Sequence, residues 1–142
     1  MGEPALALVP LCSVDSLLTE GTVVARGYGT LMEDYVVHDA SVSGDRLRGQ
    51  MQGKLTVDWM SGPGATVTLR ARASITTDDG ATLIVRYEGR SDVSEGRGAA
   101  PCYASATFDA SDPRYLWLNL VKAVGKGVID DRRVHWDWYE VK

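Results

Sequence analysis

Residues 66–90 read TVTLRARASITTDDGATLIVRYEGR, and this stretch decides the fold of the chain. Before the turn, apolar residues alternate with polar ones through Val67, Leu69, Ala71, Ala73 and Ile75. This spacing places them on one face of a β-strand. An Asp-Gly step between two strand-like runs is the strongest local signal for a β-hairpin. The stretch therefore predicts two antiparallel strands joined by a turn over residues 78–81.

Strand-like segments also occupy most of the remaining chain, bounded by turn-forming residues. They are Met1–Val14, Gly21–Tyr28, Asp34–Val42, Leu47–Trp59, Tyr103–Phe108, Tyr115–Val124 and Arg133–Val141. Because no convincing amphipathic helix separates them, we predict an all-β protein with a single domain over residues 1–142. A sandwich and a closed barrel both shelter sheet edges, and we favour a single antiparallel β-barrel of about eight or nine strands.

The composition indicates which partners and which cellular compartment to expect. The chain has 15 basic and 19 acidic residues, a net charge of -4, and its basic residues are scattered, so we expect no nucleic-acid partner. The apolar opening of the chain carries Glu3 and two prolines, so we interpret it as a strand and not as a secretion signal. No apolar run is long enough to span a bilayer. We therefore expect a cytoplasmic protein that does not associate with membranes.

Cysteines and histidines give no sign of a metal site. Cys12 and Cys102 are far apart and lack the spacing of a zinc motif, so we expect free thiols. The chain has only two histidines, His38 and His135, and no clustered carboxylates accompany them. We expect neither a metal nor another cofactor.

Aromatic residues suggest a ligand cavity inside the barrel. A barrel of about eight strands is either filled by side chains or wide enough for one small ligand. Rings that also carry a polar atom can stack against a ligand and orient it by hydrogen bonds. The candidates for binding a hydrophobic or aromatic small molecule are Tyr35, Trp59, Tyr87, Trp117 and Trp138. Alternatively these rings form only the core. The glycine-containing loop Ser91–Pro101 is a candidate lid.

Short motifs in a fixed order resemble the domain-of-unknown-function family 3237, a group of small β-barrel proteins. They are Val57-Asp58-Trp59, Leu69-Arg70-Ala71-Arg72, the hairpin from Thr77 to Ile84, Tyr87-Glu88-Gly89-Arg90, Phe108 with Asp112-Pro113-Arg114-Tyr115, Trp117-Leu118-Asn119, and Tyr139-Glu140-Val141. The resemblance covers roughly residues 21–142 and implies a barrel with a pocket, without a defined reaction. At the level of the fold, the expected barrel is allene-oxide-cyclase-like or lipocalin-like.

Four polar residues are candidates for chemistry in the cavity. Asp58 beside Trp59 is a candidate acid or base, and Arg72 is a candidate for binding a carboxylate or enolate. Asn119 can fix a carbonyl group or, alternatively, tie a neighbouring loop. His38 shares a strand face with Val36, Ala40 and Val42 and is a candidate for ligand binding, or else a hydrogen-bonded core residue.

These residues lead to two hypotheses of different classes. The first is a cofactor-independent cyclase, isomerase or dehydratase, which orients a reactive substrate and excludes water. The second is a non-catalytic carrier of small ligands. Strict alternation points Asp58 and Arg72 outward if Val57 and Ala71 point inward. If the two polar residues are instead buried, their apolar neighbours need a covering partner, which predicts a homo-oligomer.

Overall fold

The computed structural model describes residues 5–25, 31–62 and 64–142, with only the backbone described at residues 20–25 and 31–34. In this part of the chain the backbone forms strands and one short 3-10 helix, η1. The elements are β1 (Leu8–Ala25), β2 (Leu31–Ser43), β3 (Gly49–Met51), β4 (Leu55–Gly62), β5 (Thr66–Thr77), β6 (Thr82–Asp92), β7 (Cys102–Ala110), η1 (Pro113–Leu120), β8 (Ala123–Asp130) and β9 (Arg133–Val141). No described helix is long and apolar enough to cross a bilayer.

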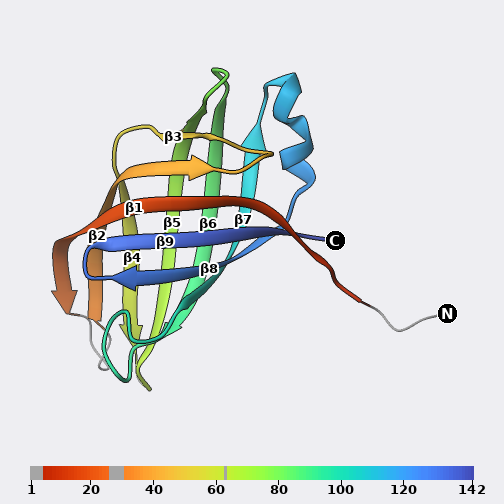
Figure 1. Ribbon diagram of the computed structural model, residues 1–142. Helices are drawn as coiled ribbons and strands as arrows, with labels where there is room; N and C mark the ends of the chain where they lie inside the picture. The colour runs from red at the N-terminus through yellow and green to blue at the C-terminus, as the bar shows by residue number, and fades with distance from the viewer. Residues whose placement is uncertain (1–4, 26–30, 63) are drawn as a thin grey trace.

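The strands close into an antiparallel barrel (Figure 1). From β1 the ladder runs through β9, β8, β7, β6 and β5, and then through β4 and β2 back to β1. Closure leaves no long unpaired edge, because every strand of the ring has a neighbour on each side. The prediction of a single antiparallel β-barrel is confirmed.

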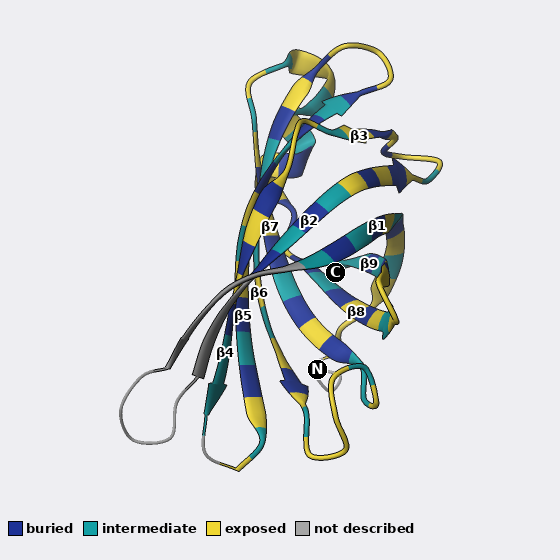
Figure 2. Cartoon of the chain, turned by 90° about the vertical axis from the view of Figure 1, so that its left-hand side faces the viewer, coloured by how far each residue is buried: buried dark blue, intermediate teal, exposed yellow. Residues whose placement is uncertain are grey.

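The hairpin predicted from residues 66–90 is also confirmed. Strands β5 and β6 pair in a continuous register from Thr66 opposite Asp92 to Thr76 opposite Thr82. At the turn, the Thr77 N–H donates to the Ala81 carbonyl at 2.8 Å, and Gly80 has a φ of 93°, which glycine adopts without a steric cost. Buried and exposed residues alternate along the strands (Figure 2), so the core lies inside the barrel.

The prediction of one strand over Leu47–Trp59 is wrong, because this segment forms two strands. The short β3 pairs with β2 at Ser41 and Val42, whereas β4 pairs with β2 over residues 31–37. Both β3 and β4 also pair with β5. They therefore occupy one position in the barrel wall, and the break between them contains Gly53, whose φ is 68°.

The prediction of a strand over Tyr115–Val124 is wrong as well, because η1 occupies its first half. The carboxylate of Asp112 accepts a hydrogen bond from the backbone N–H of Arg114 at 2.9 Å, and Pro113 provides a φ suited to a helix start. Leu118 of η1 is fully buried. The apolar residues of this segment thus hold a helical turn against the barrel. Strand β8 begins only at Ala123.

Candidate functional site

The interior of the barrel contains a small apolar cavity of about 70 Å³. Its wall combines aliphatic side chains with the aromatic rings of Tyr87, Phe108, Trp136 and Trp138. A second void of about 30 Å³ is bordered by Tyr35 and Trp59, and Tyr87 and Trp136 border both spaces. Pockets for drug-sized ligands measure roughly 300–1,000 Å³. A guest of this interior must therefore be compact.

Two stacked indoles form one part of the cavity wall. The rings of Trp136 and Trp138 lie 5.0 Å apart at an angle of 17°, and Tyr87 meets them edge-on at 5.9 and 5.8 Å. On the neighbouring strand β8, Gly127 lies opposite Trp136 and Gly125 lies opposite Trp138. The two glycines leave room for the two largest side chains, so the aromatic wall depends on the pairing of β8 with β9.

The hydroxyl group of Tyr87 is a polar group in this apolar environment. No described residue forms a hydrogen bond with it, and no fully buried polar side-chain atom among the described residues lacks a partner. The Tyr87 hydroxyl therefore borders open space instead of being sealed in the wall. Burial, together with the nearby Cys102 thiol, raises the pKa of Tyr87. Tyr87 consequently stays neutral and can donate a hydrogen bond to a guest.

The thiols near the cavity are also neutral. Burial, with a smaller contribution from the charge of Asp137, raises the pKa of Cys12 to about 12. Burial also raises the pKa of Cys102. Neither cysteine is in a disulfide, as predicted. Because only thiolates are strong nucleophiles, these groups are suited to packing and weak hydrogen bonding, and not to covalent catalysis.

The predicted lid, Ser91–Pro101, contributes its first two residues to β6, and the remainder packs over the smaller void. The guanidinium of Arg97 lies 5.1 Å from the centre of the Tyr35 ring. Gly98 packs closely on β8, where a Cβ would lie 2.8 Å from the carbonyl oxygen of Ile129. Both Tyr35 and Ile129 border the smaller void. The loop therefore covers this end of the interior.

Of the predicted ligand-binding residues, Tyr35, Trp59, Tyr87 and Trp138 point into the barrel. Tyr35 and Trp59 contact each other edge-on with ring centres 5.5 Å apart. Trp117 does not border either void. It lies on η1 beneath the Arg46 guanidinium, which is 4.7 Å from the ring centre.

The predicted position of His38 beside the cavity is wrong, because a β-bulge changes the alternation of β2. The register with β1 shifts between Asp15 and Leu17, and Asp39 adopts a φ of 54°. After Val37, the next inward residue is consequently Ala40. The imidazole of His38 instead contacts the Thr19 hydroxyl at 3.1 Å and the Asp39 carboxylate at 2.8 Å.

Asp58 and Arg72 lie on the outer face of the barrel, which corrects their expected position beside the cavity. Regular alternation buries Val57 and Trp59, so Asp58 between them is exposed, and Arg72 is exposed for the same reason. The apolar neighbours are already covered within the barrel. The argument for an oligomer from buried polar residues therefore does not apply, and a homo-oligomer stays a prediction.

Asn119 ties η1 to the end of β7. Its amide accepts a hydrogen bond from the Ala110 N–H and donates one to the Ala110 carbonyl, both at 2.8 Å. The side chain is exposed and borders neither void. The loop-tying alternative thus describes its position, which is not beside the cavity.

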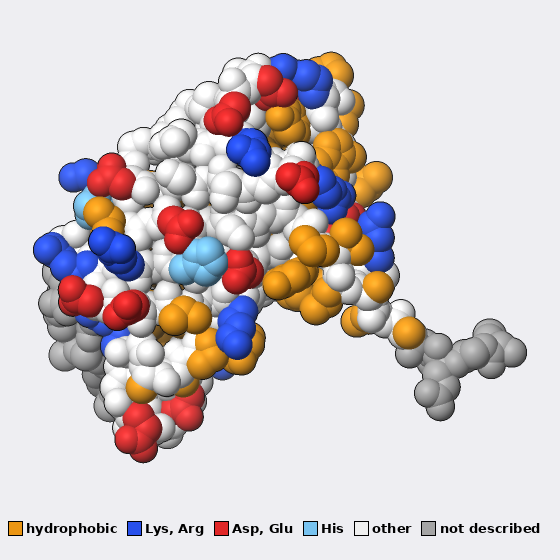
Figure 3. Space-filling model, in the orientation of Figure 1, with side chains coloured by type: hydrophobic (Ala, Val, Ile, Leu, Met, Phe, Trp, Pro, Cys, Tyr) orange, Lys and Arg blue, Asp and Glu red, His pale blue; other side chains and the backbone are white. Residues whose placement is uncertain are grey.

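Sequence reasoning missed Trp136 as a wall residue, although a signal for it was present. Trp136 and Trp138 share one parity in β9, and the Gly125-Lys126-Gly127 segment of β8 provides small residues at matching positions. His135, of opposite parity, lies on the outer face between Asp15 and Asp137. This face, formed by β1 and β9, is turned toward the viewer in Figure 3.

Comparisons with known proteins agree with this architecture. The sequence profile described as "Protein of unknown function (DUF3237)" matches residues 7–141. A β-barrel-like protein from Acinetobacter baumannii is 20% identical, with a TM-score of 0.83 and 99% of both chains covered. A conserved protein of unknown function from Rhodopseudomonas palustris is 19% identical, with a TM-score of 0.87 and coverage of 99% of this chain and 100% of its own.

A more distant structure is that of an enzyme from Penicillium herquei. It is 19% identical, with a TM-score of 0.66, and the match covers 99% of this chain and 98% of the fungal chain. No curated protein matches the sequence. At such identities the likeness shows the fold alone.

Proposed function

We propose that this chain, which belongs to the DUF3237 family of proteins of unknown function, binds a compact, uncharged organic molecule inside its barrel. We further propose that it acts on this molecule as a cofactor-independent isomerase, cyclase or dehydratase. The observation that carries the proposal is the unpartnered Tyr87 hydroxyl beside two stacked indoles in an apolar cavity.

The chemistry of the cavity defines the class of ligand. None of the described residues that line it is charged, so a charged guest would lose its hydration without gaining a counter-ion. The aromatic and aliphatic wall favours an apolar body, and the Tyr87 hydroxyl favours one acceptor oxygen such as a carbonyl. The volume of about 70 Å³ favours a small guest or a small part of a larger one.

Tyr87 is the proposed group that assists a reaction. A hydrogen bond from Tyr87 to a ligand carbonyl is stronger in a low-dielectric cavity than in water. It also strengthens as negative charge develops on that oxygen in the transition state. The enclosing wall excludes water and orients the guest. The enzyme from Penicillium herquei supports catalysis on this type of barrel, although a shared fold also permits unrelated functions.

A non-catalytic ligand carrier is the second candidate. It is favoured by the absence of a carboxylate or imidazole among the described residues that line the cavity. Enolisation requires a base that accepts a proton from carbon, and the described cavity offers only neutral donors. A carrier needs the apolar wall and the single hydrogen bond but no base.

One experiment tests ligand binding. Cyclopentanone is titrated against the tryptophan fluorescence of the wild type and of Tyr87→Phe, with cyclopentane as a probe that lacks the oxygen. We expect the variant to bind cyclopentanone about tenfold more weakly, as the loss of one hydrogen bond predicts, and to bind cyclopentane unchanged. Tyr103→Phe, at a tyrosine that is 59% exposed, is the matched control. Equal affinity of Tyr87→Phe and the wild type for cyclopentanone contradicts the proposed binding mode.

A second measurement separates the enzyme from the carrier. Enolisation exchanges the α-protons of cyclopentanone for deuterium in D₂O, which proton NMR follows directly. An exchange rate that rises with the wild type and falls with Tyr87→Phe supports catalysis. Binding without accelerated exchange supports the carrier.

A further inference from the structure

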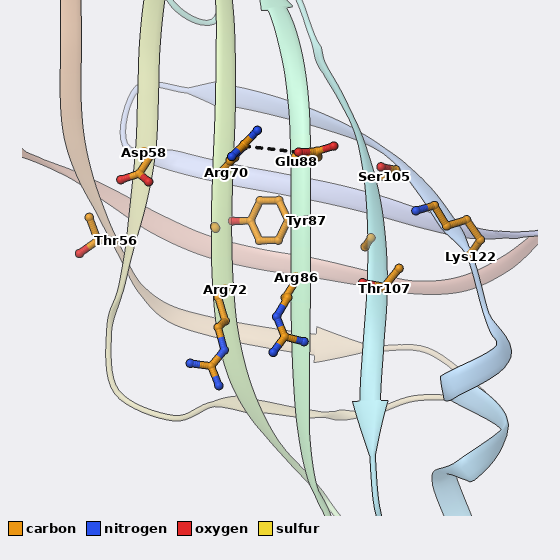
Figure 4. A pocket seen from close by; sticks show the side chains of 12 residues that line it. Thr56, Asp58, Arg70, Arg72, Arg86, Tyr87, Glu88, Ser105, Thr107 and Lys122 are labelled. Atoms are coloured by element: carbon orange, nitrogen blue, oxygen red, sulfur yellow. Dashed lines mark ion pairs between the residues drawn. The ribbon is translucent and has the colours of Figure 1, made fainter.

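A second concave surface lies on the outside of the barrel, across β4, β5, β6 and β7 (Figure 4). This outer groove has a volume of about 590 Å³, which is within the range of small-molecule sites. It is lined largely by charged and hydroxyl-bearing side chains, and Tyr87 is the residue that it shares with the lining of the apolar cavity. Its ligand must therefore differ in chemistry from that of the cavity.

The strand register arranges the side chains of the groove in two rows. In the first row, Asp58 lies opposite Arg70, and Arg70 lies opposite Glu88. Arg70 and Glu88 form an ion pair at 3.4 Å, so charges of opposite sign alternate along this row. The row largely neutralises itself.

The second row brings two positive charges together. Arg72 lies directly opposite Arg86, and Arg86 lies opposite the hydroxyl-bearing Thr107. Figure 4 shows the two guanidinium groups side by side on the outer face. Like charges at opposed positions destabilise a sheet. The arrangement therefore costs stability unless an anion lies between the groups.

Protein carboxylates compensate only part of this charge. Arg86 forms an ion pair with Asp109. The side chains of Arg72 and Lys122, which also line the groove, have no ion-pair or hydrogen-bond partner among the described residues. The side chains of Arg72 and Lys122 thus remain available for a ligand, next to Arg86, which has one carboxylate partner.

We propose that the Arg72–Arg86 row binds an oxyanion, the carboxylate or phosphate group of a small molecule. A guanidinium presents a planar fork of donors that matches two oxygens of either group. Two opposed forks can hold one oxyanion between them, and Thr107 and Lys122 provide further donors at the same groove. This site goes beyond the proposed function, because none of its cationic residues lines the cavity, although Tyr87 borders both spaces.

The proposal is tested by calorimetric titration at low ionic strength with inorganic phosphate and with succinate. We expect at least one of them to bind the wild type, and Arg72→Met and Arg86→Met each to weaken binding about tenfold or more. A preference for phosphate identifies phosphate esters as the ligand class, and a preference for succinate identifies carboxylates. If the methionine variants do not fold, Arg72→Lys replaces them in the test. Lysine keeps the charge but lacks the planar pair of donors, so we expect this variant to weaken binding as well.

Two controls make the test specific. Arg90→Met removes a charge from the same strand as Arg86 at a position outside the groove, and should leave binding unchanged. Met51→Ala, at a residue that lines the cavity and not the groove, should also leave it unchanged, which separates this site from the cavity. The proposal is overturned if neither anion binds, if Arg90→Met weakens binding as much as Arg72→Met does, or if Arg72→Met changes the oligomeric mass in light scattering and not the affinity.

Discussion

Gly125 on β8 lies directly opposite Trp138 on β9, and a Cβ at Gly125 would lie 2.5 Å from Cε3 of the indole. The same relationship joins Gly127 to Trp136, where the distance to Cε2 is 2.6 Å. A side chain at either glycine would displace an aromatic ring of the cavity wall. Strand pairing and cavity shape are therefore coupled at these positions.

Gly125→Ala should destabilise the protein by about 1–3 kcal/mol, because the added methyl group overpacks a filled site. Urea unfolding followed by far-UV circular dichroism measures the change. Gly62→Ala is the matched control, since the nearest atom to its Cβ is 4.0 Å away and its φ is not in the left-handed region. Equal effects of the two substitutions would show that the indole does not set the available space.

Asn119→Ala should destabilise the protein by about 1–2 kcal/mol, because it leaves the Ala110 N–H and carbonyl without their amide partner. Asn119→Asp keeps the acceptor but places a carboxylate oxygen against the Ala110 carbonyl, so it should cost at least as much as Asn119→Ala. Cyclopentanone binding should remain unchanged in both variants, since the side chain lies outside the cavity. A selective loss of binding with full stability would instead indicate a role in ligand recognition.

The fold was predictable from sequence where alternation is regular, and much of the site was not. Residues 66–90 specify a hairpin because Val67, Leu69 and Ile75 alternate without interruption up to an Asp-Gly turn. His38 was misplaced because one non-glycine residue, Asp39, adopts a positive φ and shifts the parity of the strand. Such a bulge depends on the neighbouring strand and leaves little local signal.

Long-range pairing explains the other differences. Gly125 and Gly127 face two indoles only because β8 pairs with β9. The glycine and tryptophan segments can each be seen in the sequence, but their pairing cannot. Periodicity alone also did not distinguish the helical turn of η1 from a strand, and the Asp112–Pro113 start signal was the better guide.

The hydrogen-bonded group of His135, Asp15 and Asp137 should make stability depend on pH. Hydrogen bonding to Asp15 is the main cause that raises the pKa of His135 above 6.5. A raised folded-state pKa gives stability that is fully present below pH 6.5 and is lost as the pH rises through the folded value. A hydrogen bond from Ser13 lowers the pKa of Asp137 below 3.8. The stability that this carboxylate contributes is therefore lost only as the pH falls through its lowered folded-state pKa.

Unfolding free energies at pH 5.5 and 8.5 check the histidine contribution. The wild type should be less stable at pH 8.5 by no more than about 1 kcal/mol, because the side chains are partly exposed and solvent screens their charges. His135→Gln should abolish this part of the difference. His38→Gln is the comparison, and an equal flattening of the pH profile by both variants would assign the effect to histidine charge in general.

Cys12 should react slowly with a thiol reagent in the folded protein. With a pKa of about 12, only about one thiol in 10⁴ is ionised at pH 8, and the thiolate is the reactive form. Release of the chromophore from Ellman's reagent should therefore be slow for the native protein and complete within minutes in guanidinium chloride. Single substitutions of Cys12 and Cys102 by Ser assign the two reactions, and fast labelling of Cys12 in the native state would contradict its raised pKa.

The volume of the cavity should limit the size of the guest, and Met51 offers a way to change it. Met51 lines the cavity and is only partly buried, so Met51→Ala should enlarge the space at a cost near the lower end of about 2–5 kcal/mol. The wild type should bind cyclopentanone more tightly than cyclooctanone, and the variant should bind cyclooctanone several-fold better, measured by tryptophan fluorescence. Met60→Ala removes the same side chain from a position that borders neither void and should leave the preference unchanged. If both variants admit the larger ketone equally, the binding site lies outside the barrel.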